Sequence, residues 1–244
     1  MPGFLPPSRL SNTVTLDGHE ITADEIELLD PNRTVYRYKL APGSFRHNIP
    51  PTATSVIVKQ QKGEWEEESE DEERAYNRLK DLQGDVIPTF YGRGRFDGIP
   101  AIILSELHGI TLDDLARSND CKVPVELLKA YPERVFDEFS KYRALYRDQK
   151  LDNFLLCDEG KVMVVDLEQV EFPAQLRDWQ YSINQEGARS LVEDFTYLRR
   201  PKRESSPLAF WMSACDENAL QDELVEFAPA NFRDRIGKPA STAA

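Results

Sequence analysis

The sequence predicts an α+β fold with two lobes, a sheet-rich N-terminal lobe and a shortened, mainly helical C-terminal lobe. Up to about residue 105 the apolar residues follow the pattern of three strands, one helix and two further strands. After this point helical spacing dominates, and one stretch within it predicts a β-hairpin. A chain of 244 residues can bury a large core, either as one domain or as two lobes.

The pattern divides the chain into four regions. We expect a mobile or edge-strand leader over residues 1–20, the N-lobe over residues 21–105, the C-lobe with its hairpin over residues 106–203 and a C-terminal extension over residues 204–244. The basic run at residues 199–203 precedes this extension. We interpret it as a helix cap before a linker, with a nuclear-import signal as the alternative.

The N-lobe is predicted to contain five strands and one helix. Its strands are expected over residues 25–32, 34–41 and 55–60, within residues 82–92 and over residues 99–104. The helix is expected over residues 66–82, where Glu72, Tyr76 and Leu79 share one face at helical spacing. A Pro-rich connection separates the second strand from the third.

The C-lobe is predicted to begin with a short helix after Thr111. Asp113 and Asp114 lie in its first turn, as expected at the positive end of a helix dipole. Further helices are expected over residues 125–145, with Pro132 interrupting the spacing, over residues 180–198 and over residues 216–227. The hairpin is expected over residues 154–165, with a polar turn between two apolar runs.

Three polar residues around the hairpin are typical of a phosphoryl-transfer site. Asp148 and Asn153 lie in the run YRDQKLDN (146–153), and Asp166 lies in the run VVDLE (164–168). An aspartate can take the proton of an attacking hydroxyl, while an amide oxygen and a second aspartate bind the metal ion. The hairpin would hold Asn153 and Asp166 at one end, where both could reach one Mg²⁺ through the hard oxygen ligands that this ion requires.

This run resembles the catalytic loop of protein kinases, in which His-Arg-Asp is followed by four residues and Asn, and later by Asp-Phe-Gly. The chain keeps Arg147, Asp148, Lys150, Asn153 and Asp166. It resembles the divergent, fungal-type protein-kinase-like proteins. The resemblance covers about residues 30–170 and implies a bilobal protein-kinase-like fold with ATP and Mg²⁺ as cofactors.

The chain also departs from the family pattern. Tyr146 stands where the family has His, and Leu167-Glu168 stand where it has Phe-Gly. Losing that glycine stiffens the turn after Asp166 and puts the family's in-and-out switching of the segment in doubt. No Gly-rich phosphate loop precedes the third strand, and at the nearest substitute, residues 30–33, Pro31 removes one backbone N–H. An Ala-Pro-Glu motif is also missing, so the peptide-docking platform is abbreviated or absent.

In the N-lobe the resemblance implies a phosphate-binding lysine and its ion-pair partner. Lys59 ends the third strand, where the family's lysine holds the α and β phosphates. Glu72 is the expected partner of Lys59, with Glu68 and Glu73 as alternatives. The acidic density of this segment otherwise indicates a solvated helix face.

The remaining roles concern the hinge and the transfer step. Residues 105–109 would form the hinge, where backbone groups of Glu106 and His108 would hydrogen-bond an adenine edge. Asp148 would be the catalytic base, and Lys150 would neutralise charge on the transferring phosphoryl group.

Composition points to a soluble intracellular protein in the cytosol or the nucleus. Three widely spaced cysteines indicate neither a disulfide framework nor a zinc site. No apolar stretch approaches the ~20 residues of a membrane span, so no membrane partner is expected. The net charge of -13 disfavours nucleic acid as a ligand, because a phosphate backbone needs a basic surface. The expected partners are a nucleotide and an unidentified protein or small-molecule acceptor.

Two functions remain open on this evidence. The first is an ATP-dependent phosphotransferase, which the retained polar positions favour. The second is a catalytically weak or inactive pseudokinase that serves as a binding or scaffolding module, which the degenerate phosphate loop, the Leu-Glu ending and the truncated C-lobe favour. A third interpretation, an accidental match in an unrelated α+β protein, conflicts with the joint order and spacing of the motifs.

Overall fold

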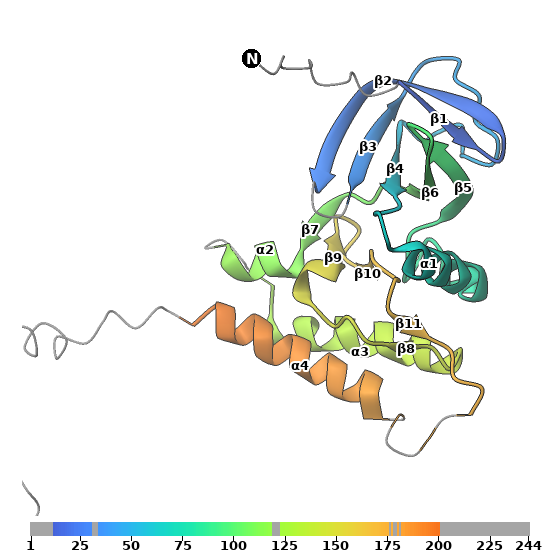
Figure 1. Ribbon diagram of the computed structural model, residues 1–244. Coiled ribbons are helices and arrows are strands. Elements are labelled where there is room, and N and C mark those ends of the chain that lie inside the picture. The colour runs from blue at the N-terminus through green and yellow to red at the C-terminus, as the bar shows by residue number, and fades with distance from the viewer. Residues whose placement is uncertain are drawn as a thin grey trace, which may run out of the picture. The chain divides into compact units, whose positions relative to one another are not determined.

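The computed structural model describes most of the first 200 residues of the chain (Figure 1). The described residues are 12–30, 34–118, 123–175, 177, 180 and 182–200. The chain divides into two units, Met1–Arg199 and Arg200–Ala244, and every described helix and strand belongs to the first. The predicted phosphate-loop substitute around Pro31, most of the basic run at residues 199–203 and the predicted helix at residues 216–227 lie outside the described residues.

Six antiparallel strands form a closed barrel in the N-terminal half. They are β1 (Thr13–Leu16), β2 (His19–Asp30), β3 (Val35–Leu40), β4 (Ser55–Gln60), β5 (Phe90–Phe96) and β6 (Ile99–Ser105), paired in the order β1-β2-β3-β4-β6-β5. Part of the predicted leader thus forms β1, because alternation places Val14 and Leu16 in the barrel core. Gly94 permits the β1–β5 closure, since a Cβ there would lie 1.6 Å from the carbonyl oxygen of Thr15.

One helix packs beside the barrel (Figure 1). This helix, α1 (Glu66–Arg78), is followed by a 3₁₀ turn, Lys80–Leu82, so the predicted helical segment changes type near its end. Its acidic first turn suits the positive end of the helix dipole. Glu72, Ala75 and Tyr76 are its buried residues, and they share the face that turns toward the rest of the protein.

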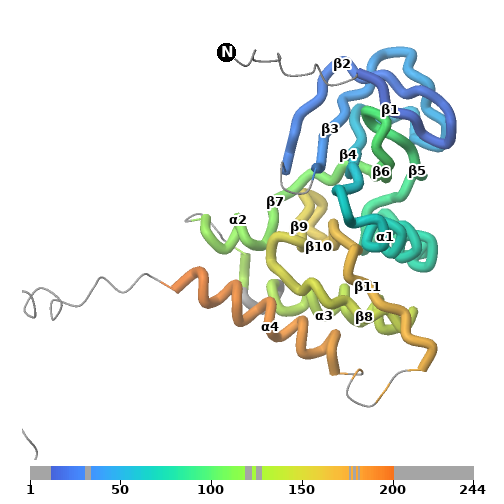
Figure 2. The backbone as a smooth tube through the Cα atoms, viewed as in Figure 1, coloured from blue at the N-terminus to red at the C-terminus, as the bar shows by residue number. Residues whose placement is uncertain are grey.

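The second half is built from helices around small sheets. Its elements are β7 (Gly109–Thr111), α2 (Leu112–Arg117), α3 (Val125–Lys141), β8 (Leu145–Tyr146), a 3₁₀ turn (Leu151–Asn153), β9 (Phe154–Cys157), β10 (Val162–Val164), β11 (Val170–Glu171) and α4 (Ser182–Leu198). The Thr111 side chain caps α2 by accepting a hydrogen bond from the Asp114 amide at 3.0 Å. The traces of α3 and α4 run side by side, and the two helices are in contact (Figure 2).

The predicted hairpin is confirmed as β9 and β10. The two strands pair antiparallel, with Val164 opposite Phe154 and Val162 opposite Leu156, and β7 adds a third strand to the sheet. A separate two-stranded sheet pairs β8 with β11. The two sheets connect the segment before Asp148 and the segments on both sides of Asp166, and so fix the backbone around the predicted site.

The buried apolar residues form two clusters. One fills the barrel and includes Val14, Tyr38 and Phe96. The other runs from α1 through the hairpin to α3 and α4, and includes Tyr76, Leu79, Phe139, Tyr146, Phe154 and Leu191. Among the described helices, none combines the length and the apolar character needed to cross a membrane.

Candidate functional site

The candidate site is centred on the Lys59 side chain, which leaves β4 and contacts three carboxylates. The Lys59 Nζ lies 2.8 Å from Glu72 Oε2, 3.0 Å from Asp166 Oδ1 and 2.8 Å from Glu168 Oε1. β4 holds the lysine between two partner strands, opposite Val35 of β3 and Ile102 of β6. Residues that are far apart in the sequence are therefore brought to one ammonium group.

Of the three glutamates considered as partners of Lys59, Glu72 is the one that contacts it. Glu73 instead pairs with Arg93 at 3.1 Å. Burial raises the pKa of the Glu72 carboxyl to about 7, the Lys59 ammonium opposes this shift, and the nearby Asp166 charge adds to it. For Lys59, burial alone would lower the pKa, but the charges of Glu72, Asp166 and Glu168 outweigh burial and raise it.

The residues of the predicted catalytic loop contact one another through Asp148. Asn153 Nδ2 donates to Asp148 Oδ2 at 2.7 Å and to the Asp148 carbonyl oxygen at 3.0 Å. Lys150 Nζ lies 2.7 Å from the other carboxylate oxygen, Asp148 Oδ1. Both carboxylate oxygens of Asp148 thus have a partner within the loop, and Asn153 is fully buried.

Backbone hydrogen bonds join this loop to the strand before Asp166. The Val165 amide donates to the Asn153 carbonyl oxygen at 3.0 Å, and the Asp166 Oδ1 atom accepts from the Glu168 amide at 3.2 Å. Asn153 and Asp166 thus lie at the same end of the hairpin. The side-chain NH₂ of Asn153 is turned toward Asp148, and a shared cation between Asn153 and Asp166 stays a prediction.

Asn184 positions the loop and was not found from the sequence. Its Oδ1 accepts from the Tyr146 amide at 3.3 Å, and its Nδ2 donates to the Ala144 carbonyl and to Ser140 Oγ, each at 2.9 Å. The side chain is buried on α4. A signal was present in the sequence, because Asn184 occupies the same helical stripe as Ala188 and the apolar residues that follow it.

A cavity of about 320 Å³ opens beside Lys59. Its walls include the apolar residues Val35, Ile57, Leu104 and Leu155, and its lining also includes Lys59 and Asp166. Apolar walls with a few polar groups are typical of a small-molecule site. The residues present therefore fit a nucleotide, with the apolar walls suited to the base and Lys59 and Asp166 suited to its phosphates and metal ion.

The predicted hinge residues Glu106 and His108 differ in their placement. Glu106 lines the cavity, and its carboxylate binds Arg37 Nε at 2.5 Å and the Ser55 hydroxyl. His108 is not among the lining residues. Its carbonyl oxygen accepts from the Asp158 amide at 3.0 Å, because pairing of β7 with β9 extends to this residue. The ion pair of Glu106 with Arg37 left no signal in the sequence.

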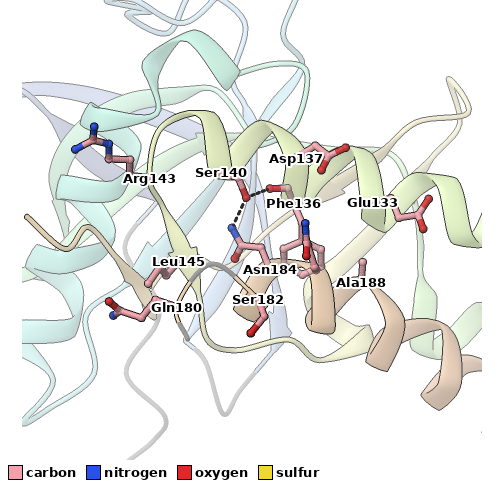
Figure 3. A pocket seen from close by; sticks show the side chains of 11 residues that line it. Glu133, Phe136, Asp137, Ser140, Arg143, Leu145, Gln180, Ser182, Asn184 and Ala188 are labelled. Carbon is pink, nitrogen blue, oxygen red and sulfur yellow. Dashed lines mark hydrogen bonds between the residues drawn. The ribbon is translucent and has the colours of Figure 1, made fainter. Parts of the chain in front are cut away.

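A second, larger cavity of about 650 Å³ lies between α3 and α4, where Asn184 donates to Ser140 (Figure 3). Its lining contains none of the predicted catalytic, phosphate-binding or metal-binding residues. The larger volume therefore does not identify the candidate site. The smaller cavity is the one that combines apolar walls with Lys59 and Asp166.

Comparison of the whole chain with known proteins finds a likeness in structure. No family model matches the chain, and no curated protein sequence matches it. The crystal structure of the Mycobacterium tuberculosis PknI kinase domain is similar, with a TM-score of 0.55, 18% sequence identity and 81% of each chain covered. A double mutant of that domain gives a TM-score of 0.54 at 16% identity, with 80% of this chain and 81% of that chain covered. The chain therefore has a protein-kinase-like α+β fold.

Proposed function

We propose that this chain is an ATP-dependent phosphotransferase of the divergent, fungal-type protein-kinase-like kind, with two lobes and a shortened C-lobe. One observation carries the proposal. Lys59 is buried beside an apolar cavity and contacts both Glu72 of α1 and Asp166 beyond the hairpin, at 2.8 and 3.0 Å. The lysine, the helix glutamate and the metal-binding aspartate must be in place together for kinase-type phosphoryl transfer.

Each residue of the site would have a separate role in this reaction. Bound Mg-ATP would supply the phosphoryl group. Lys59 would hold phosphate oxygens and Glu72 would orient Lys59, while Asp166 and Asn153 would provide oxygen ligands for Mg²⁺. Asp148 would orient the acceptor hydroxyl and take its proton, and Lys150, which contacts Asp148, would reduce the negative charge near the transfer.

A specific observation favours the alternative, a pseudokinase that acts as a binding or scaffolding module. Glu168 stands where the kinase pattern has glycine, and its carboxylate lies 2.8 Å from Lys59 Nζ. Phosphate groups would have to compete with this carboxylate for the lysine. Strong competition would lower nucleotide affinity and leave the fold without turnover.

Nucleotide binding and transfer, measured on the same preparations, test the proposal. Calorimetric titration of the full chain with ATP, with and without Mg²⁺, gives affinity. Release of labelled inorganic phosphate from γ-labelled ATP gives transfer, with water as the acceptor present in the assay. We expect Asp166→Asn to weaken Mg-ATP binding at least about 10-fold, because a metal ligand loses its charge. Asp148→Asn should leave binding nearly unchanged and lower transfer about 100-fold or more.

The matched control is Asp158→Asn, which changes an exposed aspartate in the turn after β9. This variant should change neither ATP affinity nor transfer. Absence of ATP binding by the wild-type chain in both conditions would contradict the proposed enzyme. Binding without transfer would favour the scaffolding alternative. Equal loss of binding in Asp148→Asn and Asp166→Asn would reduce Asp148 to a structural role.

A further inference from the structure

Two buried carboxylates and one half-buried carboxylate surround one ammonium group in the candidate site. The side chains of Lys59 and Glu72 are 8% and 3% exposed, and those of Asp166 and Glu168 are 10% and 15% exposed. All three carboxylates are contacts of the same Nζ atom. The cluster therefore contains one positive group and three acidic groups in a region almost closed to water.

This charge ratio leaves the cluster short of positive charge. Removing an ion from water is costly unless an opposite charge compensates it, and one ammonium compensates one carboxylate. With all three acids ionised, two negative charges remain. A divalent cation carries the charge that balances them.

The spacing of the oxygens suits a single metal ion. One oxygen from each carboxylate can be chosen so that all three lie within 4.8 Å of one another. Mg²⁺ binds oxygens at about 2.0–2.1 Å in octahedral geometry, so its ligands lie about 3–4 Å apart. Withdrawal of the Lys59 ammonium from between them would leave these carboxylates close enough to hold a common ion, and carboxylate oxygen is the ligand that such ions prefer.

A buried hydroxyl next to the carboxylates also points to a missing ligand. Tyr76 lies one helical turn after Glu72 and is fully buried, and its hydroxyl has no hydrogen-bond partner among the described residues. Burial raises the pKa of the Tyr76 phenol, and the charges of Glu72, Asp166 and Tyr146 raise it further. The i, i+4 spacing puts Tyr76 beside Glu72 on the buried face of α1. Buried polar groups are normally satisfied by protein or by ordered water. A water bound to the metal ion would satisfy this one.

Two of the three carboxylates line a small cavity next to Lys59, and the third, that of Asp166, lines the 320 Å³ cavity. Lys59, Glu72 and Glu168 line a small cavity of about 10 Å³ together with Trp65 and Ser69. This volume is close to that of one water-sized probe. Glu168 and Glu72 are not among the residues that line the 320 Å³ cavity, so two of the three ligands of such an ion do not depend on a nucleotide.

We propose that Glu72, Asp166 and Glu168 bind one divalent cation of the Mg²⁺ class in the absence of nucleotide, and that the cation competes with the Lys59 ammonium for these carboxylates. Glu168, which replaces the glycine of the kinase pattern, is the ligand that creates this site. The proposal goes beyond the proposed phosphotransferase and stands or falls without it, because it concerns the nucleotide-free protein.

The test is a titration of the nucleotide-free full chain with Mn²⁺, followed by the loss of the free-ion electron paramagnetic resonance signal and by calorimetry. We expect one saturable site in the wild type. Glu168→Gln should weaken binding at least about 10-fold, because a ligand loses its charge while keeping its shape. Glu159→Gln, which removes an exposed carboxylate in the turn before β10, should leave the affinity unchanged.

Lys59→Met supplies a second variant with an effect of opposite sign. Removing the competing ammonium should tighten Mn²⁺ binding, or, if the variant unfolds without metal, Mn²⁺ should restore its folded circular dichroism. A wild-type chain with no saturable site would overturn the proposal. So would an equal affinity in Glu168→Gln and Glu159→Gln, or weaker binding in folded Lys59→Met.

Discussion

The Arg147 guanidinium binds both carboxylate oxygens of Glu171. Arg147 Nε lies 3.1 Å from Glu171 Oε1 and Nη2 lies 3.0 Å from Oε2. The Arg147 amide also donates to the Gln169 carbonyl at 3.0 Å, and Val170 pairs with Tyr146 in the small sheet. The loop that carries Asp148 is therefore joined by side chain and backbone to the segment that follows Asp166.

Breaking this side-chain pair should have a small effect on stability. Arg147 and Glu171 are 34% and 51% exposed, and exposed ion pairs contribute about 0–1 kcal/mol. We expect Glu171→Gln to lower the free energy of unfolding in urea by less than about 1 kcal/mol, and to do so less at high salt because salt screens the pair. A loss of several kcal/mol would mean that the pair, and not the backbone pairing, holds the two segments together.

Asn184→Ala should have a much larger effect. It removes the partners of the Tyr146 amide and the Ala144 carbonyl in a buried place, and unsatisfied buried groups cost about 1–3 kcal/mol each. We expect the free energy of unfolding to fall by about 2–4 kcal/mol in urea denaturation. Gln185→Ala, at the exposed neighbouring position of α4, should change it by less than about 0.5 kcal/mol. Similar losses in both variants would contradict the anchoring role of Asn184.

Gly187 and Gln149 form a second anchor between the loop and α4. Gln149 Nε2 donates to the carbonyl oxygens of Tyr146 at 2.8 Å and Ile183 at 3.2 Å. A Cβ on Gly187 would lie 2.4 Å from two atoms of the Gln149 amide. Alanine at this position would therefore displace Gln149 from its hydrogen bonds.

The effect of Gly187→Ala on the free energy of unfolding should have opposite signs in the wild type and in Gln149→Ala. In the wild-type background we expect a loss of about 1–3 kcal/mol in the free energy of unfolding, from overpacking and lost hydrogen bonds. In the Gln149→Ala background the clash is absent, and the helix propensity of alanine should add up to about 1 kcal/mol. A double-mutant cycle by urea denaturation measures both. Additive effects would show that Gly187 and Gln149 do not interact.

Local patterns predicted the elements better than the contacts between them. Two apolar runs and a polar turn between them were sufficient for the hairpin, and helical spacing placed Glu72 on the buried face of α1. The strand at residues 13–16 was expected only as one alternative for the leader, a mobile segment or an edge strand, because a run of four residues carries little signal until its barrel partners are known. Ion pairs such as Glu106 with Arg37 depend on tertiary proximity, which spacing along one strand or helix does not encode.

The contact of Glu168 inside the site could also not be predicted from local sequence patterns. As a departure from the kinase pattern it indicated a stiffer turn, because glycine was lost. Its contact with Lys59 depends on the path of the chain after Asp166, where the Glu168 amide turns back to Asp166 Oδ1. The replacement of glycine by Glu168 thus adds a carboxylate beside Lys59, which the family pattern alone could not predict.

The buried carboxylate of Glu72 should make stability depend on pH in the metal-free protein. Burial raises its pKa from 4.5 to about 7, so between these values the folded state binds the proton that the unfolded state has released. The free energy of unfolding should therefore fall as the pH rises from about 4.5 to about 7. Above this range the contribution is fully lost, because the carboxyl is then ionised in both states.

Glu72→Gln isolates this contribution, because the amide keeps the shape of the protonated acid and does not titrate. We expect the wild type to lose stability relative to Glu72→Gln across this pH range, by up to a few kcal/mol. Urea denaturation of both proteins in EDTA, at intervals between pH 4.5 and 7.5, measures the difference. Titrating groups that do not interact with Glu72 affect both proteins alike and cancel. Parallel curves would show that the carboxyl ionises as readily in the folded protein as in the unfolded chain, and a wild type that gains relative stability with rising pH would show that it ionises more readily in the folded protein.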